Sequence, residues 1–194
     1  MTPDLVARMK EKLESPWRVA ELNPKDTLMR IGLSPSKTFC DIGAGTGLFV
    51  KAARELEAGG IFAVDTSEPM REYLRASFRD TDEGENAEAC RSISVCGSIE
   101  EVPDSVADIA LLCTVLHEVE DQEEMIRQMF RILKKDGSAA VIEFRPEAKK
   151  GAPPEVRISP DALKKMMASG GFACADDFLL GENLYACTFS KVQT

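Results

Sequence analysis

The sequence lacks any apolar run of the roughly 18 to 20 residues that a membrane-crossing helix needs. Its first residues, Met-Thr-Pro-Asp, lack the basic and then apolar layout of a secretory signal. Internal repeats and low-complexity tracts are also missing. We therefore expect a cytoplasmic protein with no membrane partner.

Positive charge is scarce. The chain has 24 basic and 33 acidic side chains, which gives a net charge of −9. A nucleic-acid partner requires Lys and Arg side chains that neutralise phosphates. The charge balance therefore disfavours nucleic acid and favours a small-molecule substrate, bound by a monomer or a homodimer.

Cysteine pairs of the C-x-x-C type are absent, and most of the six cysteines lie within apolar, strand-like runs, which indicates reduced and buried thiols. Their spacing matches no common ligand pattern, so we expect no metal. A metal or arsenic site built from Cys90, Cys96 and Cys174 stays open as the alternative. The cysteines occupy positions 40, 90, 96, 113, 174 and 187.

The length of 194 residues favours a single domain, which at this size buries roughly 70% of its unfolded surface. We expect a helical extension over residues 1–36 and a core over residues 37–194. In the extension, Leu5, Met9 and Leu13 recur every four residues, as in a helix. Ser15-Pro16 is expected to end this helix, and Asn23-Pro24 to begin a second that stops at Gly32.

The core alternates between strand-like and helix-like segments. Continuous apolar strands separated by helices indicate a parallel sheet that is covered on both faces. A helix and a closing hairpin follow a Pro-rich loop at 145–154, and an acidic surface loop is expected at 80–89. Strands are predicted at 38–42, 61–64, 93–96, 109–114, 138–144, 172–180 and 184–190, and helices at 48–58, 67–78, 122–133 and 159–169.

A glycine-rich segment, Asp41-Ile-Gly-Ala-Gly-Thr-Gly47, joins the first predicted strand to a helix. Glycines permit positive φ and a close approach of ligand to backbone, and the helix start offers free N–H groups. The dinucleotide pattern is G-x-G-x-x-G, whereas the third glycine here comes one residue early. Asp41 would also repel a pyrophosphate and attract an ammonium. A generic strand-to-helix turn is the alternative.

An acid follows the second predicted strand. Asp65 can accept hydrogen bonds from both hydroxyls of a ribose. Alternatively, it is only a helix N-terminal acid beside Ser67.

Together these segments resemble the class I S-adenosylmethionine-dependent methyltransferases, especially the small-molecule type related to quinone-biosynthesis methyltransferases. The resemblance covers about residues 20–190 and includes the final hairpin. It implies an α/β, Rossmann-like, doubly wound and mainly parallel seven-stranded sheet with a C-terminal antiparallel hairpin and an N-terminal helical lid. Its motifs are FCDIGAGTG, IFAVDTSEPM, GSIEEVP at 97–103, DIALLCTVLH at 108–117 and FRILKKDG at 130–137.

The resemblance implies S-adenosyl-L-methionine as the cofactor. The family usually has an acid at the position of Ser98, where it accepts from the adenine amino group. This chain also lacks the clear N-terminal Tyr that some relatives place over the cofactor. Met70 either flanks the adenosine or belongs to the core. The residues implied for the cofactor are Asp41, Gly43, Ala44, Gly45, Gly47, Asp65, Thr66, Met70, Ser98, Ile99 and Thr114.

On the substrate side, His117 is the only histidine and its ordinary pKa suits proton transfer near neutral pH. It is a candidate base, or alternatively a structural histidine near Glu118. Glu143 lies at the end of the fifth predicted strand and Arg145 follows it. The two either face the substrate or form a surface ion pair. Arg157 and Tyr185 are further substrate candidates.

The predicted activity is in-line methyl transfer to a small molecule. The alternative is a methyltransferase-fold protein that binds the cofactor but acts as a non-catalytic partner subunit. A nicotinamide-dependent oxidoreductase is disfavoured by the glycine spacing and the final hairpin. Trp17 either anchors the core or belongs to the helical lid.

Overall fold

The computed structural model describes residues 3–78 and 92–192. Its contacts divide the chain into two compact units, Met1–Val102 and Pro103–Thr194, which are described in turn. The seven strands follow the order β3-β2-β1-β4-β5-β7-β6. The predicted Rossmann-like α/β sheet is thereby confirmed, while the single domain stays a prediction. The expected loop at 80–89 and Cys90 lie outside the described residues.

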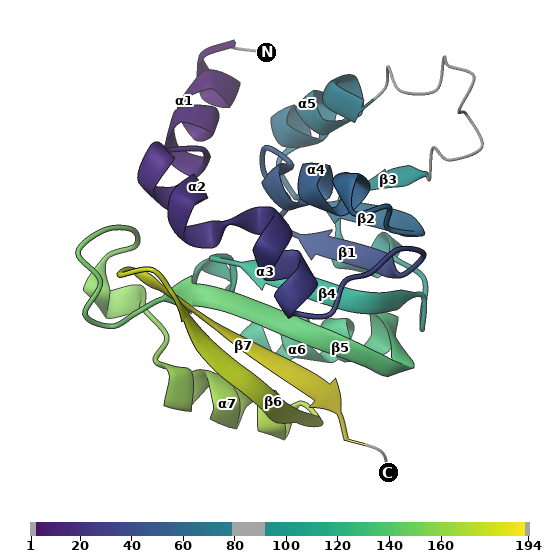
Figure 1. Ribbon diagram of the computed structural model, residues 1–194, viewed down its shortest axis with the longest axis vertical. Coiled ribbons are helices and arrows are strands. Elements are labelled where there is room, and N and C mark those ends of the chain that lie inside the picture. The colour runs from purple at the N-terminus through teal and green to yellow at the C-terminus, as the bar shows by residue number, and fades with distance from the viewer. Residues whose placement is uncertain (1–2, 79–91, 193–194) are drawn as a thin grey trace. The chain divides into compact units, whose positions relative to one another are not determined.

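The chain begins with three short helices: α1 (Pro3–Leu13), α2 (Pro16–Leu22) and α3 (Pro24–Arg30), drawn in purple in Figure 1. The expected two-helix extension is wrong in number, because Pro16 begins a helix of its own at a position where proline loses no hydrogen bond. Asn23 then takes a left-handed conformation with φ of 36°, which ends α2 just before Pro24 begins α3.

The first unit contains three parallel strands, β1 (Thr38–Ile42), β2 (Gly60–Val64) and β3 (Ile93–Cys96). Helices α4 (Leu48–Glu55) and α5 (Glu68–Phe78) follow β1 and β2. Helix α4 is shorter than predicted, because Glu57 has a φ of 58° and turns the chain toward β2. A 3₁₀ turn, η3 (Ile99–Glu101), follows β3. The loops after β1, β2 and β3 therefore leave the strands at one edge of this part of the sheet.

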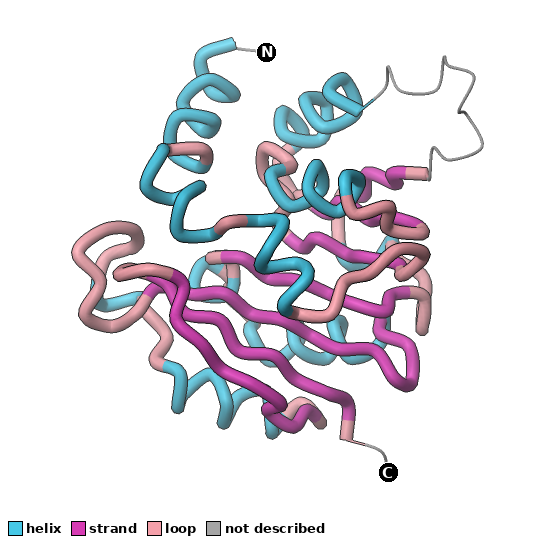
Figure 2. The backbone as a smooth tube through the Cα atoms, in the orientation of Figure 1, coloured by secondary structure: helices cyan, strands magenta, loops and turns pink. Residues whose placement is uncertain are grey.

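The second unit contains β4 (Ala107–Cys113) and β5 (Leu133–Phe144), which are parallel, and the antiparallel strands β6 (Phe172–Leu180) and β7 (Leu184–Lys191), all magenta in Figure 2. Helix α6 (Gln122–Ile132) precedes β5, and α7 (Pro160–Ser169) packs against β6. The 3₁₀ turns η4 (Leu116–Glu118) and η5 (Pro154–Val156) follow β4 and β5.

The predicted end of α6 at 133 is confirmed to within one residue, but the predicted start of the fifth strand at 138 is wrong. The helix stops at Ile132 and β5 begins at once, because Leu133 already pairs with Ala107 of β4. A register shift follows, after which Ile109 pairs with Ser138. Pairing with a distant strand overrides the polar, helix-like pattern of residues 133–137.

Apolar side chains of the strands fill the interior, among them Phe39, Ile61, Leu112 and Phe189, each no more than 2% exposed. Within residues 3–78 and 92–192, no helix combines the length and the apolar character that crossing a membrane takes. In the same part of the chain, no group of three or more His, Cys, Asp and Glu side chains could hold a metal ion.

Candidate functional site

The glycine loop after β1 depends on its glycines for its shape. Gly43, Gly45 and Gly47 have φ values of 78°, 53° and 78°, in the left-handed region that favours glycine. The backbone N–H groups of Gly43 and Ala44 both donate to the carbonyl of Val64, at 2.8 and 2.9 Å. The loop is thereby fastened to the end of β2, and Gly47 precedes the first turn of α4.

Asp65, directly after β2, is bonded to this loop. Its Oδ2 accepts from the N–H of Gly45 at 2.8 Å, and its Oδ1 accepts from the N–H of Ser67 at 2.9 Å. The second bond is the helix-start contact that the sequence left open as an alternative. Each carboxylate oxygen has two lone pairs, so both can still accept from a ligand hydroxyl.

Asp41 is the buried acid at the end of β1. It is 2% exposed, and among the described residues its Oδ2 has no hydrogen-bond partner. Burial, and then repulsion from Asp65, raise the pKa of its carboxyl group to about 7. A buried acceptor without a partner is costly unless a donor arrives. The ammonium group of a methionine-like ligand has the matching charge and donors, so this donor set fits S-adenosylmethionine.

The other expected cofactor residues of the first unit line the ends of β2 and β3. Thr66 is exposed, whereas Met70 on α5 is only 2% exposed. Ser98 is half-buried, and the neighbouring Ile99 is buried at the start of η3. These residues offer ligand atoms at one edge, and their contact with an adenosine stays a prediction.

Arg71 on α5 was missed by sequence reasoning. Its Nη1 donates to the carbonyls of Asp65 and Thr66, at 2.8 and 2.7 Å, and its guanidinium also pairs with Glu68. A Cβ built on Gly97 would lie 3.6 Å from its Cζ, so the same side chain packs beside the end of β3. The signal available was its place one helical turn after Ser67.

Helix α1 lies against the glycine loop through its last residue. A Cβ added to Gly45 would lie only 2.8 Å from Cδ1 of Leu13. The ammonium of Lys10 also lies 5.7 Å from the ring centre of Tyr73 on α5. Trp17 on α2 is half-buried. The N-terminal helices thus include a side chain that lies against the loop, as a lid would, and the lid role stays a prediction.

In the second unit, His117 and Glu143 form a buried pair. Nδ1 of His117 lies 2.7 Å from Oε2 of Glu143, and the His117 backbone N–H donates to Oε1 at 3.2 Å. Their side chains are 4% and 0% exposed. The ring also meets Phe144 edge-on, with centroids 5.7 Å apart. Because β4 and β5 are parallel, the turn after β4 and the end of β5 meet at one edge of the sheet.

A surface ion pair between Glu143 and Arg145 is therefore wrong. Glu143 is enclosed, and Arg145 pairs instead with Glu147 beyond the strand. Thr114 follows β4 with a φ of 56°, and its N–H donates to the carbonyl of Ile142 at 2.7 Å. A cofactor contact for Thr114 stays a prediction.

Arg157 and Tyr185 have structural partners. The guanidinium of Arg157 donates to the carbonyls of Ala152, Pro146 and Ala148, at 2.8, 3.0 and 2.7 Å, and so holds the loop after β5. Tyr185 is buried, and its hydroxyl donates to the carbonyl of Ile158 at 2.8 Å. Their roles toward a substrate stay predictions, and these contacts assign both to shaping the loop.

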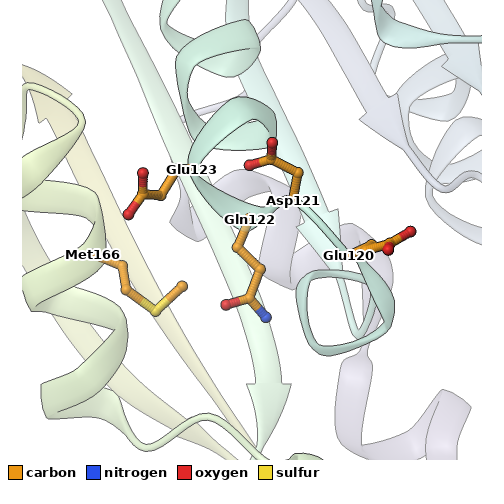
Figure 3. Close-up of a pocket in the computed structure, with 5 residues that line it drawn as sticks. All are labelled: Glu120, Asp121, Gln122, Glu123 and Met166. Carbon is orange, nitrogen blue, oxygen red and sulfur yellow. The ribbon is translucent and has the colours of Figure 1, made fainter.

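A cavity of about 640 Å³ lies between the start of α6 and α7. Figure 3 shows its lining, in which Met166 on α7 points toward the first turn of α6. The remaining lining is polar and acidic, and it includes none of the expected site residues. Asp121 is already used there as the N-cap that accepts from the N–H of Glu124. The lining residues are Glu120, Asp121, Gln122, Glu123 and Met166.

The Rossmann-like fold, with its glycine loop, the buried acid Asp41 and the loop-bonded acid Asp65, defines the class of protein. The model of the methyltransferase domain family matches residues 40–141, just over half of the chain. The chain belongs to this family and is a class I S-adenosylmethionine-dependent methyltransferase domain.

Relatives of known name agree with this assignment. The ubiquinone/menaquinone biosynthesis C-methyltransferase UbiE of Vibrio vulnificus is 32% identical over 117 residues, which are 58% of this chain and 43% of that protein. The aligned part of the chain thus spans less than half the length of this relative.

Two solved structures share the fold. A SAM-dependent methyltransferase from Aquifex aeolicus has a TM-score of 0.83 at 22% identity, covering 96% of this chain and 98% of that one. The 1,6-didemethyltoxoflavin-N1-methyltransferase of Burkholderia thailandensis, solved with 1,6-didemethyltoxoflavin and S-adenosylhomocysteine, has a TM-score of 0.69 at 16% identity, covering 100% and 92%. At these identities the likeness concerns the fold alone.

Proposed function

We propose that this chain transfers a methyl group from S-adenosylmethionine to a small-molecule acceptor. The observation that carries the proposal is the carboxylate of Asp41, buried within the glycine loop with an unpartnered oxygen. A site that encloses an acid with an unpartnered oxygen beside a glycine-rich loop suits a ligand with an ammonium group.

The residues of the first unit have distinct tasks in this proposal. Asp41 and the loop Gly43–Gly47 hold the methionine end, and Asp65 accepts from the ribose hydroxyls. Ser98 and Ile99 receive the adenine, where the Ser98 hydroxyl or the Ile99 backbone replaces the acid usual in the family. Thr66 and Met70 complete the adenosine side. When bound, the cofactor supplies an electrophilic methyl group on a sulfonium sulfur.

The acceptor side belongs to the second unit. His117 is the proposed catalytic base, because it follows β4 at the edge of a parallel sheet where ligands generally bind. A small acceptor is supported by the net charge of −9 and by the small molecules in the names of the relatives. Holding the reactants in line is worth roughly 7–11 kcal/mol of the barrier.

The test is titration calorimetry followed by a screen. We expect S-adenosylmethionine and S-adenosylhomocysteine to bind well below millimolar, and NAD not to bind. A metabolite mixture with a labelled methyl donor should then yield a labelled small product together with S-adenosylhomocysteine. Absence of cofactor binding would overturn the cofactor site. Binding without any turnover would instead favour the non-catalytic partner subunit.

A further inference from the structure

The contacts between His117 and Glu143 show how the histidine ring near the end of β4 is held in place. Glu143 uses both carboxylate oxygens on one residue: Oε1 accepts from the His117 backbone N–H and Oε2 faces Nδ1 of the ring. The carboxylate lies at the end of the buried run Ala-Ala-Val-Ile-Glu-Phe, where an acid without partners would be strongly disfavoured. Its orientation is therefore fixed at both oxygens.

This arrangement selects one tautomer of the ring. A carboxylate accepts hydrogen bonds at both oxygens, so its contact with Nδ1 favours the tautomer in which Nδ1 carries the proton. In the neutral ring, Nε2 then carries the lone pair. The Glu118 side chain, whose Oε1 lies 3.8 Å from Nε2, is 65% exposed.

We infer that Glu143 is a positioning residue that holds the proton of His117 on Nδ1, so that Nε2 takes a proton from the acceptor atom that is methylated. The inference rests on the proposed function and deepens it. It adds a second residue to the catalytic apparatus and a requirement on the acceptor. The acceptor must bear a proton on its attacking atom, as a hydroxyl, an N–H or an acidic carbon does.

The transfer balances in charge and in electrons. The proton moves from the attacking atom to Nε2 of His117. The electron pair left on the attacking atom forms the new bond to the methyl carbon, and the pair of the broken carbon–sulfur bond passes to sulfur. One positive charge is thereby lost from the sulfonium and one appears on the imidazole ring, beside Glu143. The ring returns the proton to solvent after product release.

The neighbouring titratable groups are consistent with this role. Glu143 on β5, Glu118 on η4 and Tyr185 on β7, opposite Glu143 in the strand register, face the ring or its carboxylate. Burial, and then the charge of Glu143, raise the pKa of the Tyr185 phenol far above its ordinary value, so Tyr185 stays neutral. The imidazolium therefore has two carboxylates near it and no neighbouring phenolate.

The single histidine makes the tautomer directly measurable. An NMR experiment that correlates the carbon-bound ring protons with the ¹⁵N ring nitrogens shows which nitrogen carries the proton. Because the chain has one histidine, the signals need no assignment. In the wild-type protein above the ring's own titration, we expect a protonated Nδ1 and an unprotonated Nε2. A protonated Nε2 in wild type would overturn the inference without any variant or substrate.

Glu143→Gln provides the sharper test. The Gln oxygen must stay opposite the His117 N–H, so its amino group faces Nδ1 and donates to it. The proton should therefore move to Nε2, where it blocks the base. With the acceptor found in the screen, we expect kcat/KM to fall at least about 100-fold, the contribution of a positioned base. The acid limb of the pH profile should move to lower pH, because the ring loses a counter-charge.

Glu118→Gln is the matched control, since it removes a nearby carboxylate that does not contact Nδ1. It should leave the proton on Nδ1. An unchanged tautomer and pH profile in Glu143→Gln would overturn the inference, as would an acceptor whose attacking atom has no proton. If the cofactor does not bind, the proposed function fails, while the NMR result still decides the tautomer.

Discussion

The backbone N–H of Gly45 donates to Oδ2 of Asp65 across 2.8 Å. The two segments that sequence motifs singled out, 20 residues apart, are thus joined directly. Asp65 thereby fixes the glycine loop, and in the proposed site the same carboxylate also offers oxygens to the ribose. Substitution at this one residue should therefore affect both ends of the bound nucleoside.

Asp65→Ala should weaken binding of S-adenosylmethionine by at least about tenfold, because it removes an acceptor and leaves the Gly45 N–H without its partner. Asp65→Asn should lose less affinity for S-adenosylmethionine, since the amide oxygen of the asparagine can keep one of the two backbone contacts. Calorimetry with both variants measures the difference. Wild-type affinity in Asp65→Ala would contradict the proposed ribose site.

Cofactor affinity should rise with pH between about 6 and 8. The carboxyl group of Asp41 has a pKa raised to about 7 by burial and by Asp65, so below this pH it is neutral. A bound ammonium favours the ionised form, and binding near neutral pH should release a proton. Calorimetry in buffers of different ionisation enthalpy measures that proton. The matched ligand is 5′-methylthioadenosine, which lacks the ammonium and should show no such dependence.

The carboxyl group of Asp41 should also make the ligand-free protein less stable as the pH rises. Between the unfolded pKa of 3.8 and the folded value of about 7, the folded chain keeps a proton that the unfolded chain has lost. The free energy of unfolding should therefore fall over this range, by on the order of 4 kcal/mol. Urea denaturation of wild type and Asp41→Asn at pH 5 and pH 8 tests this. Equal changes in the two proteins would exclude Asp41 as the source.

Arg71→Ala should loosen the segment after β2 and weaken nucleoside binding, because Arg71 holds the carbonyls of Asp65 and Thr66. Loss of hydrogen bonds from a charged donor costs about 1.5–3 kcal/mol. Arg75→Ala is the control, since Arg75 is exposed and pairs only with Glu68 among these contacts. Thermal unfolding and 5′-methylthioadenosine titration should separate the two variants. Equal unfolding temperatures and equal affinities of the two variants would show that Arg71 contributes no more than an exposed arginine does.

Gly45→Ala should destabilise the protein through a left-handed backbone and through collision with Leu13. The collision part should be relieved by Leu13→Ala, so the double variant should be more stable than the two single changes predict. Denaturation of all four proteins gives this coupling. Strict additivity would show that α1 does not lie against the loop in solution.

Local backbone requirements were predictable from the sequence. The glycine loop was located to the residue because positive φ is a demand that glycine alone meets easily. The bounds of β3 and β6 are those predicted, since turns and polar residues delimit them. The start of β5 was missed because its first residues look helical and become a strand only through pairing with Ala107.

Partnerships between distant residues were not predictable. His117 and Glu143 were both singled out, but their 26-residue separation gives no hint that their side chains meet. Their contact depends on the register between β4 and β5, which is set by packing along the whole strand. Arg71 was missed, and the loop contacts of Arg157 were not foreseen, for a related reason, since their partners are backbone carbonyls that no residue pattern reveals.

The antiparallel entry of β7 brings the turn before it to the loop that leaves β5. Oδ1 of the buried Asn183 accepts from the N–H groups of Lys149 and Lys150, at 3.0 and 3.1 Å, and the Arg145 N–H donates to the Asn183 carbonyl. The two segments, 34 residues apart, thus form one architectural unit. If the loop after β5 were exchanged between relatives without the turn before β7, Asn183 would lose these hydrogen-bond partners. Loop and turn should therefore be transferred together when acceptor preference is engineered.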